Sequence, residues 1–292
     1  MTWPPRARRA NPMETLRAVF VVCLALAITA VLLPVHLVAQ WRRWPLRKTT
    51  AQTWHRWVAR AMGLRIDIHG APARAGGHGV LLVANHASWL DIVALGSVAP
   101  VSFIAKDDVR DWPVFGLLAR LQDSVFVSRN ARATTRTQAE TIAQRLADGD
   151  TIVLFAEGTT SCGNFVYPFK SSLFGALGVG ESDRRDDALV QPVAIAYTGV
   201  DGIPMGRQSR PLAAWPGDIG IGPHLTRILR EGRIDIHVGF GDPITVTPGT
   251  NRKRLATETE RAVRRMMSAL VRGQRPSSAG TQKPLRTAHE ES

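Results

Sequence analysis

One histidine and one aspartate in this sequence have the types and the spacing for acid–base chemistry. They are His86 and Asp91, in the segment Asn85-His86-Ala87-Ser88-Trp89-Leu90-Asp91 that follows a short apolar run. A carboxylate beside an imidazole holds one ring nitrogen protonated and leaves the other free as a base. The same spacing also suits a structural role, in which Ser88 caps a helix and Asp91 completes a capping box. The residues alone leave both roles open.

Two cations and a glycine-containing segment follow other apolar runs. Lys106 and Arg129 stand at the ends of two predicted strands, where they either converge on an anionic group or face solvent. The segment 157–159 reads Glu-Gly-Thr, and a glycine there lets backbone N–H groups approach a phosphate or an oxyanion. The same three residues are common in turns, so the segment is informative only in combination with others.

The elements that position these residues are predicted by the pattern of apolar runs. Strands are expected at 64–69, 80–83, 101–105, 124–127, 151–155, 189–196 and 234–238. Helices are expected at 50–62, 92–97, 134–147, 223–230 and 252–271, the last of them basic and amphipathic. Strands that alternate with helices predict an α/β fold, with a mixed sheet flanked by helices.

An uncharged stretch of 22 residues, 18–39, precedes this region. It is long enough to cross a hydrocarbon core about 30 Å thick, and it has arginines on both sides and Trp41 and Trp44 after it. We predict an N-terminal membrane-anchoring helix. A cleaved signal peptide is the alternative, but the run is long and lacks a small-residue cleavage site. Pro34 and His36 near its end allow a bent or in-plane anchor as well as a full crossing.

The formal net charge of +13 is concentrated at the two ends of the chain. Residues 1–60 carry +9 and residues 251–292 carry +6, whereas residues 61–250 are net −2. This division favours an anionic membrane surface over nucleic acid as the partner. We therefore divide the chain into a basic flank and anchor (1–48), a folded domain (49–250), a basic helix (251–272) and a disordered tail (273–292). Two cysteines far apart fit a reducing, cytoplasmic setting.

Taken together, the blocks resemble the glycerolipid acyltransferase family typified by 1-acylglycerol-3-phosphate O-acyltransferase. The resemblance covers about residues 60–240 and rests on four blocks in order. They are N-H-x-x-x-x-D at 85–91, a K…W-P-x-x-G…R block that ends at Arg129, E-G-T at 157–159 with P-F-K at 168–170, and P-V at 192–193.

This resemblance implies a reaction and a set of site residues. His86 would be the general base that takes the proton of a lipid hydroxyl, and Asp91 would orient it. Acyl-CoA or acyl carrier protein would be the co-substrate, with no metal and no further cofactor. The enzyme would act at the cytoplasmic face of the inner membrane. The residues expected to bind substrate are Lys106, Arg129, Glu157, Gly158 and Thr159.

The third block departs from the family pattern F-P-E-G-T-R-S. Ala156 replaces the proline and Thr160 replaces the arginine, which removes a cation suited to a phosphate. We expect 1-acyl-sn-glycerol-3-phosphate as the acceptor, with lyso-ornithine lipid, which has no phosphate, as the alternative. An ester hydrolase would need a nucleophile motif such as G-x-S-x-G, which the sequence lacks. A non-enzymatic basic membrane adaptor is the remaining alternative, and it leaves His86 and Asp91 without a purpose.

Overall fold

The computed structural model describes residues 11–73, 79–127, 132–175, 188–216, 220–247 and 250–276. Within these residues the chain forms one mixed sheet of nine strands. The strands are β1 (Leu64–His69), β2 (Val80–Ala84), β3 (Ser102–Lys106), β4 (Val125–Val127), β5 (Thr151–Phe155), β6 (Ala188–Val200), β7 (Ile203–Pro204), β8 (Ile234–Phe240) and β9 (Ile244–Val246). Their spatial order is β1-β8-β6-β2-β5-β3-β4, with β7 and β9 paired to β6.

The direction of the strands makes the sheet mixed. Strands β6, β2, β5, β3 and β4 are parallel neighbours, whereas β8 runs antiparallel to β6 and parallel to β1. The predicted fold class, a mixed sheet flanked by helices, is confirmed. Short elements that the sequence pattern did not predict include β7 and β9.

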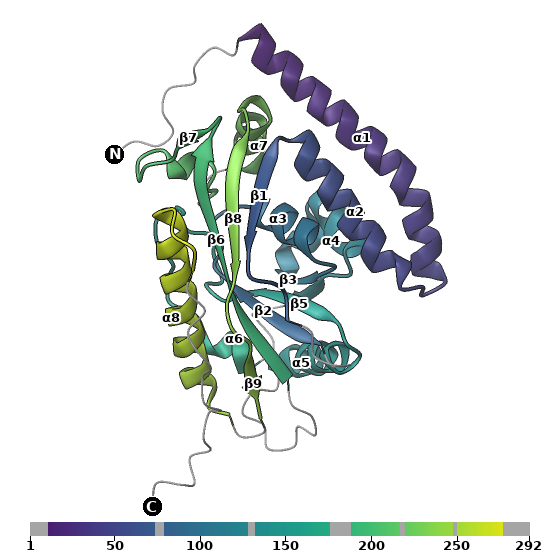
Figure 1. Ribbon diagram of the computed structural model, residues 1–292. Coiled ribbons are helices and arrows are strands. Elements are labelled where there is room, and N and C mark those ends of the chain that lie inside the picture. Colours follow the sequence, from purple (N-terminus) through teal and green to yellow (C-terminus); the bar gives the residue numbers. More distant parts are fainter. Residues whose placement is uncertain are drawn as a thin grey trace, which may run out of the picture.

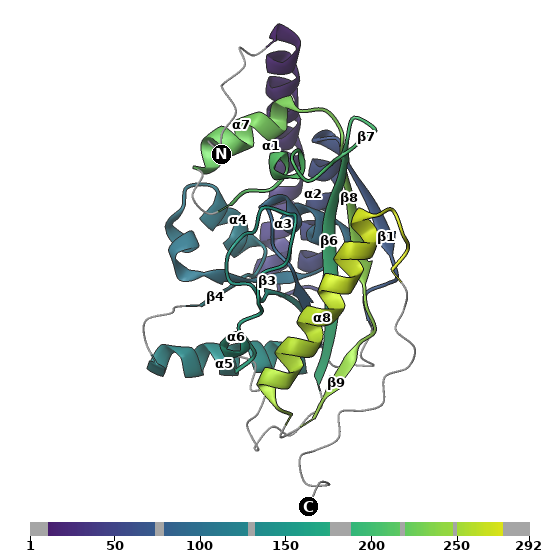
Figure 2. The same ribbon diagram turned by 90° about the vertical axis from the view of Figure 1, so that its left-hand side faces the viewer.

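Helices cover both faces of the sheet (Figures 1 and 2). They are α1 (Pro12–Trp41), α2 (Leu46–Ala61), α3 (Leu90–Val98), α4 (Phe115–Leu121), α5 (Arg132–Ala147), α6 (Ser171–Gly175), α7 (Ile221–Arg230) and α8 (Arg252–Val271), with 3-10 turns η1 (Asp107–Asp111) and η2 (Arg210–Leu212). Side chains of β2 alternate between the two faces. Leu82 joins a core with α2, α3 and α7, and Leu81 joins a core with α5, α6 and α8.

Helix α1 has an exposed apolar surface, yet polar contacts fix it to the domain near both ends. Its most apolar window has a mean hydropathy of 2.8, and only 6% of that window is buried, unlike the core helix of a soluble protein. Near its start the Arg17 guanidinium donates to backbone carbonyls of Met62, Leu229 and Gly232. Near its end His36 bonds to Thr50 in α2. The helix continues through Pro34 and lies along α2 (Figure 1). It is a candidate membrane helix.

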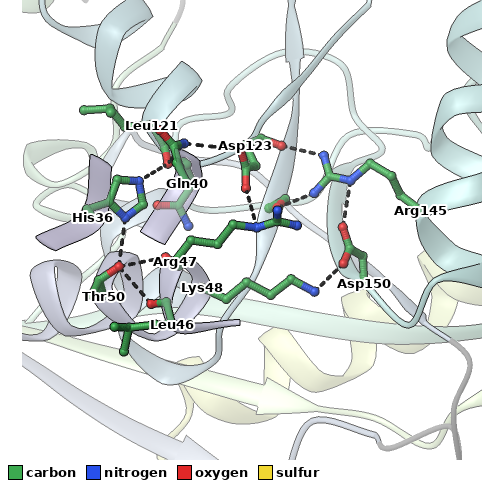
Figure 3. Close-up of polar contacts among 12 residues, drawn as sticks. His36, Gln40, Leu46, Arg47, Lys48, Thr50, Leu121, Asp123, Arg145 and Asp150 are labelled. Carbon is green, nitrogen blue, oxygen red and sulfur yellow. Dashed lines mark hydrogen bonds and ion pairs between the residues drawn. The ribbon is translucent and has the colours of Figure 1, made fainter. Parts of the chain in front are cut away.

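A partly buried ion-pair network joins the α1–α2 hairpin to the amino edge of the sheet (Figure 3). Asp150, just before β5, pairs with Lys48 of α2 and with Arg145 of α5, the latter at 2.7 Å between Nε and Oδ2. Arg145 also donates to the backbone oxygen of Asp123 and to Ser102 at the start of β3. Burial acts to raise the pKa of Asp150, but hydrogen bonds from Lys48 and Arg145 outweigh it, so the pKa is lowered.

We expect Asp150→Asn to lower the free energy of unfolding by about 2 to 4 kcal/mol near neutral pH, because two partly buried cations lose their carboxylate. The folded pKa lies below the ordinary value of 3.8, so the carboxylate stabilises the fold above that pH and stops doing so as the pH falls through the folded pKa. Denaturant unfolding in detergent should therefore show the two proteins converging at low pH.

The control for this measurement is Asp107→Asn. Asp107 pairs with Arg110 on the surface, with 48% of its side chain exposed, and should cost less than about 1 kcal/mol. Equal losses in the two variants, or a difference that does not change with pH, would contradict the role given to Asp150.

Candidate active site

The site lies where β2 and β5 end. Because the two strands are parallel neighbours, His86 after β2 and Glu157 after β5 meet at the same edge of the sheet. The buried Asn85 side chain extends the pairing of β2 with β6, since its amide donates to the Ile195 carbonyl at 2.9 Å and accepts the Ile195 N–H at 2.8 Å. The turn that carries His86 is therefore held to β6.

His86 and Asp91 form the predicted pair. The His86 Nδ1 lies 2.8 Å from Asp91 Oδ2, with 17% of the histidine side chain exposed and the aspartate fully buried. The imidazole stacks on Phe155 at the end of β5, with ring centroids 3.9 Å apart and planes inclined by 15°. The ring is thus fixed in plane and in tautomer. Its second nitrogen, Nε2, has no hydrogen-bond partner within the part of the chain that the structure describes.

Asp91 also satisfies the turn that precedes α3. Its Oδ2 accepts the backbone N–H groups of Ala87 at 2.7 Å and Ser88 at 2.9 Å, besides contacting His86. The helix begins at Leu90, whose backbone N–H donates to Ser88 Oγ at 3.3 Å, as the capping role expects. The two roles that the sequence left open for Asp91 are therefore compatible, because one oxygen serves both the backbone of the turn and the imidazole.

Tyr197 is a site residue that sequence reasoning missed. Its hydroxyl donates to Asp91 Oδ1 at 2.5 Å, and the whole side chain is buried. Burial and the charge of Asp91 raise the pKa of Tyr197 well above its ordinary value, so the hydroxyl stays a donor. The available signal is its polar group directly after the apolar run 193–196 of a core strand, since a buried tyrosine hydroxyl needs a partner.

The structure gives Glu157 a different role from the predicted contact with substrate. Its carboxylate is buried, and its two oxygens accept the backbone N–H groups of His86 and Tyr167, both at 2.7 Å. Burial raises the pKa of Glu157 to about 7, although both N–H groups act to lower it. Ser161 further on donates its N–H to the His86 carbonyl at 2.8 Å. Glu157 and its loop therefore clamp the backbone of His86.

The other predicted binding residues are more exposed. Gly158 has a φ of +68°, and a Cβ there would lie 3.0 Å from the Lys170 ammonium, so the lysine side chain crosses directly over the glycine. Thr159 is exposed beside it, and Lys106 is exposed at the end of β3. These contacts with substrate stay predictions. Arg129 lies outside the described residues.

Comparison with known proteins identifies the family. A family model described as Acyltransferase matches residues 65–196. A lyso-ornithine lipid O-acyltransferase of Rhizobium meliloti (strain 1021) is 46% identical over 257 residues, which are 88% of this chain and 87% of that protein. The chain belongs to the acyltransferase family. The resemblance inferred from the four sequence blocks is thereby confirmed.

Other relatives of this acyltransferase carry two kinds of name. A lyso-ornithine lipid O-acyltransferase of Brucella abortus (strain 2308) is 48% identical over 89% of this chain and 97% of its own. A 1-acyl-sn-glycerol-3-phosphate acyltransferase of Neisseria meningitidis is 33% identical over 73% of this chain and 78% of its own. The crystal structure of a Thermotoga maritima 1-acyl-sn-glycerophosphate acyltransferase has the same fold, with a TM-score of 0.62, 21% identity, and coverage of 92% and 98%.

Tyr197→Phe tests whether the tyrosine hydroxyl positions Asp91 for acyl transfer. We expect kcat to fall about tenfold, because a hydrogen bond to a buried carboxylate is lost. Without this donor Asp91 attracts protonated His86 more strongly, so kcat/KM should rise at a higher pH than in the parent enzyme. The measurement is the pH profile of acyl transfer.

The control is Tyr167→Phe, at the other of the two tyrosines in the chain. Tyr167 reaches Glu157 through its backbone N–H, which the substitution keeps. If the pH profile of Tyr197→Phe is the same as that of the parent, the hydroxyl does not position Asp91 for catalysis and the side chain serves only in packing.

Glu157→Gln should change how stability depends on pH. The folded pKa of about 7 exceeds the ordinary 4.5, so the folded state holds a proton that the unfolded state releases between these values. Stability of the parent enzyme should fall by about 3 kcal/mol across this window from this group, and the glutamine variant should lack that term. Unfolding curves at pH 5 and pH 8 measure the difference. Glu231→Gln, at a partly exposed carboxylate paired with Arg227, is the control. A constant offset between parent and Glu157→Gln would contradict the raised pKa.

Proposed function

We propose that this acyltransferase moves a fatty acyl group from a thioester to the free hydroxyl of a lyso-ornithine lipid. The observation that carries the proposal is the His86–Asp91 pair, with Nδ1 bound to the carboxylate and Nε2 open at a partly exposed edge of the sheet. The relatives with 46% and 48% identity bear the name of this activity and support the choice of acceptor.

The geometry suits a direct transfer. Nε2 of His86 accepts the proton of the acceptor hydroxyl as its oxygen attacks the thioester carbonyl. Asp91 stabilises the imidazolium that forms, and Tyr197 keeps Asp91 in place. When the tetrahedral intermediate collapses, the carbon–sulfur bond breaks and the imidazolium returns the proton to the departing thiolate. The products are an ester and a free thiol, and no acyl-enzyme forms.

This choice reverses the order of acceptors expected from sequence. The sequence blocks predict lysophosphatidate first and lyso-ornithine lipid second. Thr160, which is half-buried, stands where the family pattern has an arginine. This position therefore offers no guanidinium to bind a phosphate. The ornithine headgroup carries a carboxylate, for which a single ammonium such as Lys170 over Gly158 suffices. The Neisseria relative keeps lysophosphatidate as the second candidate.

The position of α1 supports catalysis at a membrane surface. The helix exposes large apolar side chains, among them Phe20, Leu26 and Val31, while Arg17 and His36 hold it against the domain. We propose that α1 contacts lipid along its length rather than crossing the bilayer as a free helix, and that the domain lies on the cytoplasmic side, where acyl thioesters are made.

The acceptor proposal predicts at least a tenfold higher kcat/KM for lyso-ornithine lipid than for 1-acyl-sn-glycerol-3-phosphate in mixed micelles with the same acyl donor. His86→Ala should lower transfer to either lipid by about a thousandfold, since general base catalysis contributes on this scale. Labelled donor and chromatography of the product lipids measure both quantities.

His237→Ala serves as the histidine control. His237 lies on β8 and bonds to His69 of β1 at 2.8 Å, so its loss should leave transfer within about threefold of the parent. A preference for the phosphate-bearing lipid would refute lyso-ornithine lipid as the acceptor, but it would not affect the assignment to the acyltransferase family. Undiminished transfer by His86→Ala would overturn the mechanism.

A further inference from the structure

The outer surface of α8 carries six cations, with Glu258 and Glu260 among them. Its inner side is buried against the sheet through Leu255, Val263, Met266 and Leu270. The opposite side, here called the α8 basic face, is exposed and consists of Lys253, Arg254, Arg261, Arg264, Arg265 and Arg272. Lys253 to Arg272 spans roughly 28 Å of helix at 1.5 Å per residue. Four of these cations also line a shallow depression in the surface, together with Glu258.

The α8 basic face points away from the apolar helix. Figure 1 places α8 and α1 on opposite sides of the molecule, with the sheet and α2 between them, and Figure 2 shows α8 nearest the viewer with α1 far behind. A lipid surface in contact with the exposed side of α1 would therefore lie on the opposite side of the molecule from the α8 basic face. The charge of α8 is displayed to water.

Helix α8 is also joined to the loop that holds His86. Glu260 of α8 accepts the backbone N–H of Phe169 at 2.8 Å, and Arg264 pairs with Glu260 at 2.8 Å. Phe169 ends the loop whose beginning, Glu157, accepts the N–H of His86. The field of Arg264 also acts on the Glu157 carboxyl and lowers its pKa, against the larger effect of burial. A molecule bound to the α8 basic face would be close to this loop.

We infer that the α8 basic face is the docking surface for an acidic acyl carrier protein that delivers the thioester. This inference rests on the proposed function and names its donor. Charge complementarity carries it, since cations spread along the length of a helix match the surface of an acidic protein rather than the compact phosphates of a nucleotide thioester. The geometry agrees, because a water-soluble donor approaches from the side opposite the lipid acceptor.

The test compares two charge-reversed enzymes in transfer to lyso-ornithine lipid. The first carries Arg254→Glu, Arg261→Glu and Arg265→Glu on the α8 basic face. The second carries Arg65→Glu, Arg110→Glu and Arg207→Glu, three exposed arginines elsewhere, and loses the same charge. Each is assayed with acyl carrier protein and with acyl-CoA as donor. A milder variant, Arg261→Gln with Arg265→Gln, guards against a folding defect.

For the α8 variant we expect KM for the acyl carrier protein to rise at least tenfold with kcat within twofold, and KM for acyl-CoA to stay within twofold. The control variant should match the parent with both donors, and the glutamine variant should show a smaller rise for the carrier protein. The parent's KM for the carrier should also increase steeply with salt.

Three outcomes would overturn the docking proposal. One is an equal change of KM in the α8 and control variants. Another is that the parent transfers acyl groups from acyl-CoA but not from acyl carrier protein. The third is loss of binding to phosphatidylglycerol vesicles by the α8 variant with KM for the carrier unchanged, which would make the face a membrane contact. Absence of transfer to lyso-ornithine lipid from either donor would instead refute the proposed acceptor, so the two failures are distinguishable.

Discussion

A buried carboxylate with no exposed surface, that of Asp91, sets the geometry of the whole site. A charge removed from water is stable only if protein donors replace its hydration. Asp91 receives four such contacts, from the ring of His86, the N–H groups of Ala87 and Ser88, and the hydroxyl of Tyr197. Three of these come from the turn after β2 and one from β6. The site therefore exists only while β2 and β6 keep their register.

The register is protected at the same point by Asn85. Its side chain pairs with both backbone groups of Ile195, two residues before Tyr197 in β6. On the other side of β2, Glu157 and Ser161 hold the backbone of His86 from the loop after β5. The histidine thus has its backbone fixed from one neighbouring strand and its partner carboxylate fixed from the other. Only the Nε2 side of the ring is left for substrate.

Sequence reasoning reached the fold class and the central pair because both depend on local patterns. Apolar runs predicted the strands of the central sheet, and α8 has the predicted bounds 252–271. Tyr197 was out of reach because its contact with Asp91 spans 106 positions and depends on the order of strands, which periodicity does not encode. Glu157 was assigned to substrate because a motif shows residue types and not which way a carboxylate points. Short elements such as α6 and β9 carry too few residues for a periodic signal.

The two faces of the sheet meet different surroundings, and the site lies at the edge between them. Helices α2, α3 and α7 cover one face, with apolar α1 outside α2, and basic α8 covers the other, while His86 lies at the ends of β2 and β5. Arg17 fixes the start of α1, and at the amino edge Lys48, Arg145 and Asp150 tie the α1–α2 hairpin to the sheet (Figure 3). Because α1 is packed against the domain and not tethered by a linker, the depth of His86 relative to lipid follows from the fold. On the proposed function, an acceptor hydroxyl at the membrane surface would then meet a thioester that approaches from water.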